Sequence, residues 1–284
     1  MAGLCCGRQR STAMILWGDD MNATYSRVLA SIFAAAALCA SGAAALAADA
    51  TGAGTGAYSV PAGTPAYIKT AVESPQRSAE HKARDANRKP AEVLTLSGVK
   101  PGDQVVEFAS FGQYFTTLVS DIVGPKGMIY MVDLPYTEER AGAGSRAFVA
   151  SHPNAKYQLV DYNAVNLPQN IDIVFNVLYY HDLPLNNIDT AKLNARIFEA
   201  LKPGGIFFIV DHNAAAGSGT RDVKTLHRID PAVIRKEVAA AGFELVEESK
   251  LLAHPGDDHT QMVFAPGLRG LTDQTIFKFR KPAK

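Results

Sequence analysis

From residue 104 to its end, the chain alternates between short apolar runs and amphipathic segments. The pattern predicts strands over 104–108, 128–132, 157–160, 171–178 and 206–210, and helices over 112–123, 137–150, 190–201 and 231–241. Near-continuous apolar strands that alternate with helices indicate an α/β fold, with a mostly parallel sheet covered on both faces. The predicted strands 244–252 and 275–280 have no helix between them, so we expect them to pair antiparallel at one edge.

Upstream of this pattern, the segment 74–88 is charged and favours a helix, with Ser74 as its cap and Pro75 in its first turn. A second short helix is predicted over 89–96, and glycines at 98–102 turn the chain into the first strand.

The N-terminus shows the order of a secretory signal peptide. Arg27 precedes an alanine-rich apolar run over 28–40, and a small-residue site, Ala45-Leu46-Ala47, follows it. We therefore expect residues 1–47 to be an upstream extension and a cleavable signal peptide, 48–66 a flexible linker rich in Gly, Ala and Thr, and 67–284 the folded domain. The protein is predicted to be periplasmic or secreted, without a membrane span after cleavage. An N-terminal anchor helix is the alternative, but the apolar run is short for a span.

Charge and cysteine content narrow the function. Lys plus Arg and Asp plus Glu both number 28, so no basic field favours a nucleic-acid partner. All three cysteines, Cys5, Cys6 and Cys39, precede the predicted cleavage site, which excludes thiolate catalysis in the mature chain. A small-molecule substrate is the expected partner, and the sequence does not specify an oligomeric state.

Three predicted strands end in an acid: Glu107, Asp133 and Asp161. In an open parallel sheet these ends line one crevice, where carboxylates can accept hydrogen bonds from ribose hydroxyls or an adenine amino group. A cap for the following helix is the simpler reading of any single acid. Their recurrence in successive units favours a nucleoside site.

The motifs VVEFASFGQY, IYMVDLP, LVDYN, IDIVFNVLYYHDL and ALKPGGIFFIVDH follow one another between residues 105 and 212. In this order the chain resembles the class I S-adenosylmethionine-dependent methyltransferases, specifically their exported, predicted group, over about residues 74–282. The resemblance implies a Rossmann-like seven-stranded sheet in the order 3-2-1-4-5-7-6, with strand 7 antiparallel and helices on both faces.

The same resemblance implies S-adenosylmethionine as the cofactor and assigns residues to it. Glu107 matches the acid that closes the first strand, Asp133 the acid that holds the ribose, and Asn176 lies where the fourth strand passes under the cofactor. The other matched positions are Ala109, Ser110, Phe111 and Gly112 in the glycine loop, Leu134 beside the adenine, and Asp161 and Tyr162 at its ring.

Three positions of the loop depart from the family pattern: Ala109 is a mild change, whereas Phe111 and Gln113 replace glycines with larger side chains. A Phe111 ring that points into the crevice would fill space that the cofactor needs, whereas one that points away would pack under the loop.

For catalysis, His181 and Asp182 follow the fourth strand. A histidine here resembles the general base of some small-molecule O-methyltransferases, and a near-neutral imidazole suits removal of a hydroxyl proton. The alternative is a structural loop histidine.

A later polar set comprises Asp211, His212, Asp222, His227, Arg228, Asp257, Asp258 and His259. Its spacing matches no compact metal motif, so no metal ligands are assigned. We expect His227 and Arg228 to shape a substrate lid with the loop 217–221. A metal-dependent hydrolase is the weakest of three hypotheses; a methyltransferase of an unknown small molecule comes first, and a periplasmic binding or scaffold protein without cofactor chemistry second.

Overall fold

The computed structural model describes residues 57–283, which belong to one compact unit. The predicted upstream extension, the signal peptide and linker residues 48–56 lie outside the described residues. Within the remainder of the predicted linker, the Tyr58 hydroxyl accepts a hydrogen bond from the backbone N–H of Ala91 (3.0 Å) and donates one to Glu92. Among the described residues, no helix combines the length and the apolar character needed to cross a membrane.

Seven strands form one sheet in the order β3-β2-β1-β4-β5-β7-β6. The strands are β1 (Gln104–Phe108), β2 (Met128–Asp133), β3 (Ala155–Leu159), β4 (Ile171–Val177), β5 (Leu201–His212), β6 (Glu244–Ser249) and β7 (Gln274–Arg280). β1 to β5 pair in parallel, and β7 is antiparallel to both β5 and β6. The fold predicted from the sequence, including the strand order and the antiparallel seventh strand, is confirmed.

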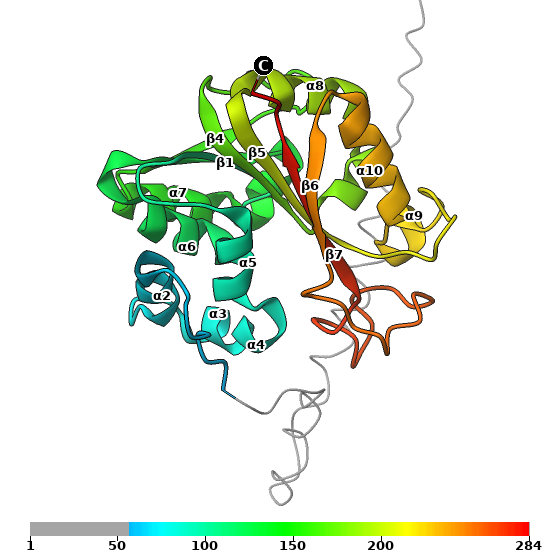
Figure 1. Ribbon diagram of the computed structural model, residues 1–284, viewed down its shortest axis with the longest axis horizontal. Coiled ribbons are helices and arrows are strands. Elements are labelled where there is room, and N and C mark those ends of the chain that lie inside the picture. The colour runs from blue at the N-terminus through cyan, green and yellow to red at the C-terminus, as the bar shows by residue number, and fades with distance from the viewer. Residues whose placement is uncertain (1–56, 284) are drawn as a thin grey trace, which may run out of the picture. The chain divides into compact units, whose positions relative to one another are not determined.

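Helices cover both faces of this sheet (Figure 1). The buried side chains of α2 (Ala66–Glu73), α5 (Pro90–Ser97), α6 (Tyr114–Val123) and α7 (Ala143–Ser151) belong to one apolar cluster. Those of α8 (Thr190–Ala200) and α10 (Pro231–Ala240) belong to the cluster on the other face. Both helices of this second cluster begin at an N-cap. The carboxylates of Asp189 and Asp230 accept backbone N–H groups of the first turns of α8 and α10, respectively.

The N-terminal helices differ from the sequence prediction. The expected helix over 74–88 is wrong in its start: Ser74 ends α2, and Ser78 caps α3 (Ala79–Ala83) by accepting the N–H of His81 at 3.1 Å. A third short helix, α4 (Asp85–Arg88), follows. Pro75 and the residues next to it form a turn because Arg77, buried against Asp85, folds the chain back at this point.

The segment Lys202-Pro203-Gly204-Gly205, which precedes the strand predicted over 206–210, lies inside β5. There the pairing with β4 shifts register between Ile171 and Ile173, and Gly204 takes a left-handed φ of 79°. β5 therefore begins at Leu201, earlier than predicted, and its other end carries Asp211 and His212 to the carboxyl edge of the sheet.

Candidate functional site

The loop between β1 and α6 keeps the shape of a glycine loop without most of its glycines. Ala109 (φ 58°), Gly112 (φ 87°) and Gln113 (φ 51°) all have left-handed backbone conformations. For a residue with a Cβ atom, this conformation costs about 1–2 kcal/mol. The carbonyl of Gly112 is held by Nε2 of His81 at 2.9 Å, which ties the loop to α3.

The predicted ribose ligand, Asp133, ends β2 and is completely buried. Its Oδ1 accepts the backbone N–H of Ser110 (2.7 Å), and both carboxylate oxygens lie within hydrogen-bond distance of the Ser110 hydroxyl (3.1 and 3.2 Å). Burial raises the pKa of Asp133 to about 6, although the hydrogen bonds from Ser110 oppose that shift. In this structure Asp133 thus stabilises its own loop.

Tyr162, predicted to lie at the adenine ring, is also buried and internally bonded. Its hydroxyl donates to the carbonyl of Val132 (2.7 Å) and accepts the N–H of Ala109 (3.2 Å). The other two predicted adenine neighbours differ from each other: Leu134 is buried in the core, whereas Asp161 is exposed and accepts the N–H of Asn163 at 2.9 Å.

Three aromatic side chains, which we call the aromatic cover, close over this region: Phe111, Tyr136 and Tyr179. The half-buried ring of Phe111 packs edge-to-face on buried Tyr179, with centroids 5.9 Å apart, and the guanidinium of Arg140 lies 5.5 Å from the Phe111 ring. The hydroxyl of Tyr136, which is 58 % exposed, lies 2.9 Å from that of Tyr179. The ring of Phe111 therefore packs toward Tyr179, which follows the end of β4.

Two more predicted cofactor residues are buried nearby. Glu107 accepts a hydrogen bond from the Thr116 hydroxyl (2.6 Å), and burial together with the charge of Asp133 raises its pKa to about 8. Asn176 lies opposite Phe108 across the β1–β4 pair and is fully buried. Neither polar atom of its amide has a hydrogen-bond partner among the described residues. Such orphaned atoms in a core are rare and often mark a place for a ligand or water.

His181 is the centre of a buried polar cluster at the ends of β4 and β5. Its Nδ1 lies 2.6 Å from Oδ1 of Asp211, and its backbone N–H donates to Oδ2 of the same carboxylate at 2.8 Å. Its Nε2 lies 3.3 Å from Oδ1 of Asp182. Burial lowers the pKa of His181, but the two carboxylates outweigh that effect and leave the pKa above its usual value.

Two histidines of the late polar set join this cluster. Nδ1 of His227 lies 3.1 Å from Oδ1 of Asp182, and the rings of His227 and His212 lie 5.6 and 5.7 Å from that of His181. Burial depresses the pKa of His212 well below its usual value, so its imidazole is neutral.

The sequence placed Asp211 in the late polar set and missed its pairing with His181. The signal was available, because β4 and β5 are neighbours in the predicted order and both end in polar residues.

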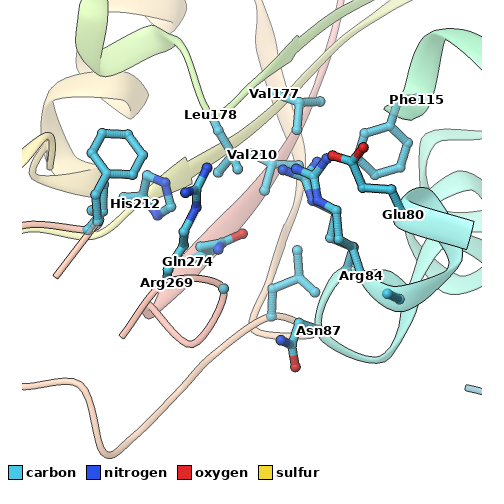
Figure 2. Close-up of a pocket in the computed structure, with 16 residues that line it drawn as sticks. Glu80, Arg84, Asn87, Phe115, Val177, Leu178, Val210, His212, Arg269 and Gln274 are labelled. Carbon is cyan, nitrogen blue, oxygen red and sulfur yellow. The ribbon is translucent and has the colours of Figure 1, made fainter. Parts of the chain in front are cut away.

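A cavity of about 500 Å³ adjoins the cluster on the face of the sheet covered by α3 and α4 (Figure 2). Figure 2 shows Leu178 and Val210 at its floor, between the side chains of Arg84 and Arg269. The lining residues are Glu80, Ala83, Arg84, Asn87, Arg88, Phe115, Val177, Leu178, Val210, His212, Leu252, Val263, Phe264, Arg269, Gly270 and Gln274. Leu178 has a left-handed φ of 57°, a strain that often accompanies functional sites.

The charged lining of the cavity is mostly basic. Arg84, Arg88 and Arg269 form no ion pair within the described part of the chain, and Glu80 is the single carboxylate among the lining residues. Burial lowers the pKa of Arg88 to about 10, which still leaves the guanidinium charged at neutral pH. The cavity thus combines an apolar floor with cationic walls.

No protein-family model matches the chain. Among curated proteins, the ubiquinone/menaquinone biosynthesis C-methyltransferase UbiE of Pasteurella multocida (strain Pm70) is 26 % identical over 119 residues, which is 42 % of this chain. The chain spans less than half the length of that relative (43 %).

Solved structures resemble the chain over a larger share of its length. An S-adenosylmethionine-dependent methyltransferase from Mesorhizobium loti superimposes with a TM-score of 0.50 at 17 % identity, covering 69 % of this chain and 99 % of the other. A putative sarcosine dimethylglycine methyltransferase from Galdieria sulphuraria gives 0.50 at 15 % identity, covering 74 % and 90 %. The chain has a class I methyltransferase fold. The resemblance predicted from the motifs is confirmed at this level. The same fold occurs in the [4+2]-cyclase SpnF, with a TM-score of 0.51 at 17 % identity over 70 % of this chain and 82 % of the other. Fold alone therefore does not decide the reaction.

Proposed function

We propose that the protein is an S-adenosylmethionine-dependent methyltransferase that acts on a small molecule bound in the cavity at the ends of β4 and β5. The observation that carries the proposal is the β1–α6 loop, which holds left-handed conformations at Ala109, Gly112 and Gln113. Ala109 and Gln113 are not glycines, so this backbone conformation is unfavourable for them. A loop kept in this shape fits a ligand that approaches its backbone, as the cofactor does in this fold.

The residues that would hold the cofactor are those predicted from the sequence, once the aromatic cover opens. Asp133 would exchange its bonds with Ser110 for the ribose, and the orphaned amide of Asn176 would gain a partner. When bound, the cofactor supplies an electrophilic methyl group. The chain itself then has to position the acceptor and remove its proton, and positioning alone accounts for much of the rate in such displacements.

Proton removal by His181 is a separate step of the proposal. Asp211 orients the imidazole through Nδ1, so Nε2 is the nitrogen that would take the proton. Because Nε2 lies 3.3 Å from Asp182, the Asp182 carboxylate must turn aside before an acceptor hydroxyl can reach it. In this step Asp182 has the role of a gate beside the base.

A second function is favoured by one specific observation. Asp133 and Tyr162, two of the side chains assigned to adenosine, are buried and bonded to the protein itself, as expected of a fold that has lost its cofactor. On this alternative, the protein is a periplasmic binding or scaffold protein that uses the cavity alone.

Isothermal titration of the purified chain with S-adenosylmethionine and S-adenosylhomocysteine separates the two functions. The proposal expects micromolar affinity for at least one of them, whereas millimolar affinity or none favours the scaffold. A His181→Gln variant then tests the base: we expect kcat to fall by about 100-fold or more while the affinity for S-adenosylhomocysteine stays unchanged.

Export to the periplasm is also part of the proposal, supported by the order of charge, apolar run and Ala45-Leu46-Ala47 in the sequence. Mass spectrometry of the protein from its native cells would test it. A mature N-terminus at Ala48 or Asp49 is expected, and an intact Met1 would contradict export.

A further inference from the structure

His181 and Asp182, which the sequence assigns to catalysis, converge with His227, which it assigns to a substrate lid. One potential ligand atom from each of these three side chains lies within 4.8 Å of the other two, and Oδ1 of Asp182 is close to both Nε2 of His181 and Nδ1 of His227. We propose that these three atoms bind a divalent transition-metal cation of the Zn²⁺ type. The site goes beyond methyl transfer, because it follows from the cluster and needs no cofactor.

The spacing of the three atoms suits a metal. Oδ1 of Asp182 lies 3.3 Å from Nε2 of His181 and 3.1 Å from Nδ1 of His227. Around a tetrahedral cation with bonds of about 2.0–2.1 Å, neighbouring ligand atoms are about 3.3 Å apart. Two histidines and one carboxylate are a ligand set of catalytic zinc sites, in which the fourth position stays open.

An outer carboxylate fixes the orientation of His181. Oδ1 of Asp211 accepts a hydrogen bond from Nδ1 of His181 (2.6 Å), so the ring proton is on Nδ1. The lone pair of Nε2 is then directed toward Asp182 and His227. Asp211 is itself held, because it accepts the backbone N–H groups of His181 (2.8 Å) and His212 (2.7 Å). Histidines that bind metals usually donate their other N–H to a carboxylate in this way.

The loop that carries His227 is held in a strained conformation. His227 has a left-handed φ of 53°, which costs a non-glycine residue about 1–3 kcal/mol. The next residue, Arg228, is completely buried and anchors the loop through Asp257 (2.8 and 3.0 Å) and the carbonyls of Asn213 and Gln261. This anchor keeps the imidazole of His227 beside Asp182. A bond from His227 to a cation there would offset the backbone strain.

The two negative charges of the cluster also favour a bound cation. Asp182 and Asp211 are two carboxylates, and within the described residues neither forms an ion pair with a lysine or arginine. The side chains of His227 and Asp182 are 29 % and 20 % exposed, which leaves a route for the ion and for a further ligand. The ring of His227 also contacts Phe264 (5.4 Å between centroids), a wall of the cavity, so the cation site adjoins that cavity.

A bound cation and a proton compete for Nε2 of His181. With the metal in place, His181 is a ligand and cannot act as the general base proposed above. His227→Gln separates the two roles, since it removes one metal ligand and leaves the His181–Asp211 pair intact.

The test is a titration of the metal-free full chain with Co²⁺, followed by the d–d absorption of the tetrahedral ion, and with Zn²⁺ by calorimetry. We expect one equivalent per chain. His227→Gln and Asp182→Asn should each weaken binding by about 100-fold or more, and Asp211→Asn by about 10- to 100-fold. Thiolate ligation by Cys5, Cys6 or Cys39 would instead produce sulfur-to-cobalt charge-transfer bands that do not respond to these variants.

His259→Gln is the matched control, because His259 also lies beside an aspartate (Asp273, 3.0 Å) but belongs to no group of three potential ligands within the described residues. Its affinity for Co²⁺ should equal that of the wild type. Circular dichroism without metal verifies that each variant is folded, and the two independent ligand variants guard against the loss of one. Absence of d–d bands in the wild type, or equal affinity in His227→Gln and the wild type, would overturn the proposal. Neither result depends on S-adenosylmethionine, so the metal site and the methyltransferase function fail separately.

Discussion

The carboxyl edge of the sheet has two halves, one on each side of the β1–β4 pair. Both are built from parallel strands, but their polar side chains have different surroundings. At the ends of β2 and β3, Asp133 and Tyr162 bond to other groups of the protein, and Tyr179 of the aromatic cover packs on Tyr162. At the ends of β4 and β5, the cluster around His181 and the unpaired arginines border a cavity of about 500 Å³. Asp133 and Tyr162 in the first half are bonded within the protein, whereas the second half places charged side chains around a cavity.

The same backbone conformation therefore occurs beside different side-chain chemistry. Left-handed residues occur in both halves: Ala109 and Gln113 on one side, Leu178 and His227 on the other. Leu178 lines the cavity between Arg84 and Arg269, and His227 contacts the partly exposed Asp182. The ends of β4 and β5 are therefore the first place to test for ligand binding.

The largest effect is expected from the anchor of the second half. Arg228→Ala removes one partner of an ion pair whose side chains are 0 % and 1 % exposed, which leaves the carboxylate of Asp257 buried without its counter-ion. We expect the free energy of unfolding, measured by urea denaturation, to fall by about 3–5 kcal/mol.

Arg221→Ala is the control, because Arg221 pairs with Asp222 but is 69 % exposed. Its loss should cost about 0–1 kcal/mol. Equal effects of the two variants would show that the loop behind His227 is not anchored by Arg228.

In the first half, burial of Glu107 makes stability depend on pH. Its folded pKa of about 8 lies above the ordinary value of 4.5, so the folded state holds its proton while the unfolded chain loses it. Wild-type stability should therefore fall, on the order of a few kcal/mol, as the pH rises from 4.5 to about 8. Glu107→Gln keeps a partner for Thr116 and should flatten this dependence in urea titrations at several pH values. A wild-type curve parallel to that of the variant would show that Glu107 is charged.

The aromatic cover is tested by Phe111→Gly, which removes the ring between the strand ends. If the ring blocks adenosine, calorimetry should find the affinity for S-adenosylhomocysteine increased about tenfold or more, equivalent to about 1.4 kcal/mol. Phe115→Leu, in the cavity wall, is the comparison and should leave this affinity unchanged. No gain in Phe111→Gly would assign the closure to Tyr179 and Tyr136 instead.

The smallest effect concerns the backbone of the loop. Ala109→Gly relieves a left-handed alanine and should raise the free energy of unfolding by about 0.5–1 kcal/mol. Ala195→Gly, in the exposed middle of α8, should lower it by about 1 kcal/mol. Thermal unfolding of both variants measures the difference, and a loss in both would mean that Ala109 is unstrained.

The sequence predicted the sheet because its signals are local. The apolar runs at 104–108 and 128–132, with Glu107 and Asp133 at their ends, predict these strands without knowledge of distant contacts. The residue at which the N-terminal helix α3 begins could not be predicted from such local signals. Ser74 and Ser78 are equivalent as caps in sequence, and the choice between them depends on the contact of Arg77 with Asp85.

The site was predictable only in part. His181, Asp182 and Asp133 were found from their positions after strands, and the assignment of roles to them remains a prediction. The convergence of His227 on Asp182 was not predictable, because the two residues are 45 positions apart and the loop geometry depends on the buried anchor of Arg228. Sequence spacing gives metal motifs only when the ligands share one helix or turn.

The left-handed Ala109 and Gln113 have a consequence for the redesign of this loop. Since the main chain keeps its course without glycine, the neighbouring strands and helices dictate that course. Single side chains of the loop can therefore be exchanged, and the space beside it enlarged or filled, without rebuilding the scaffold.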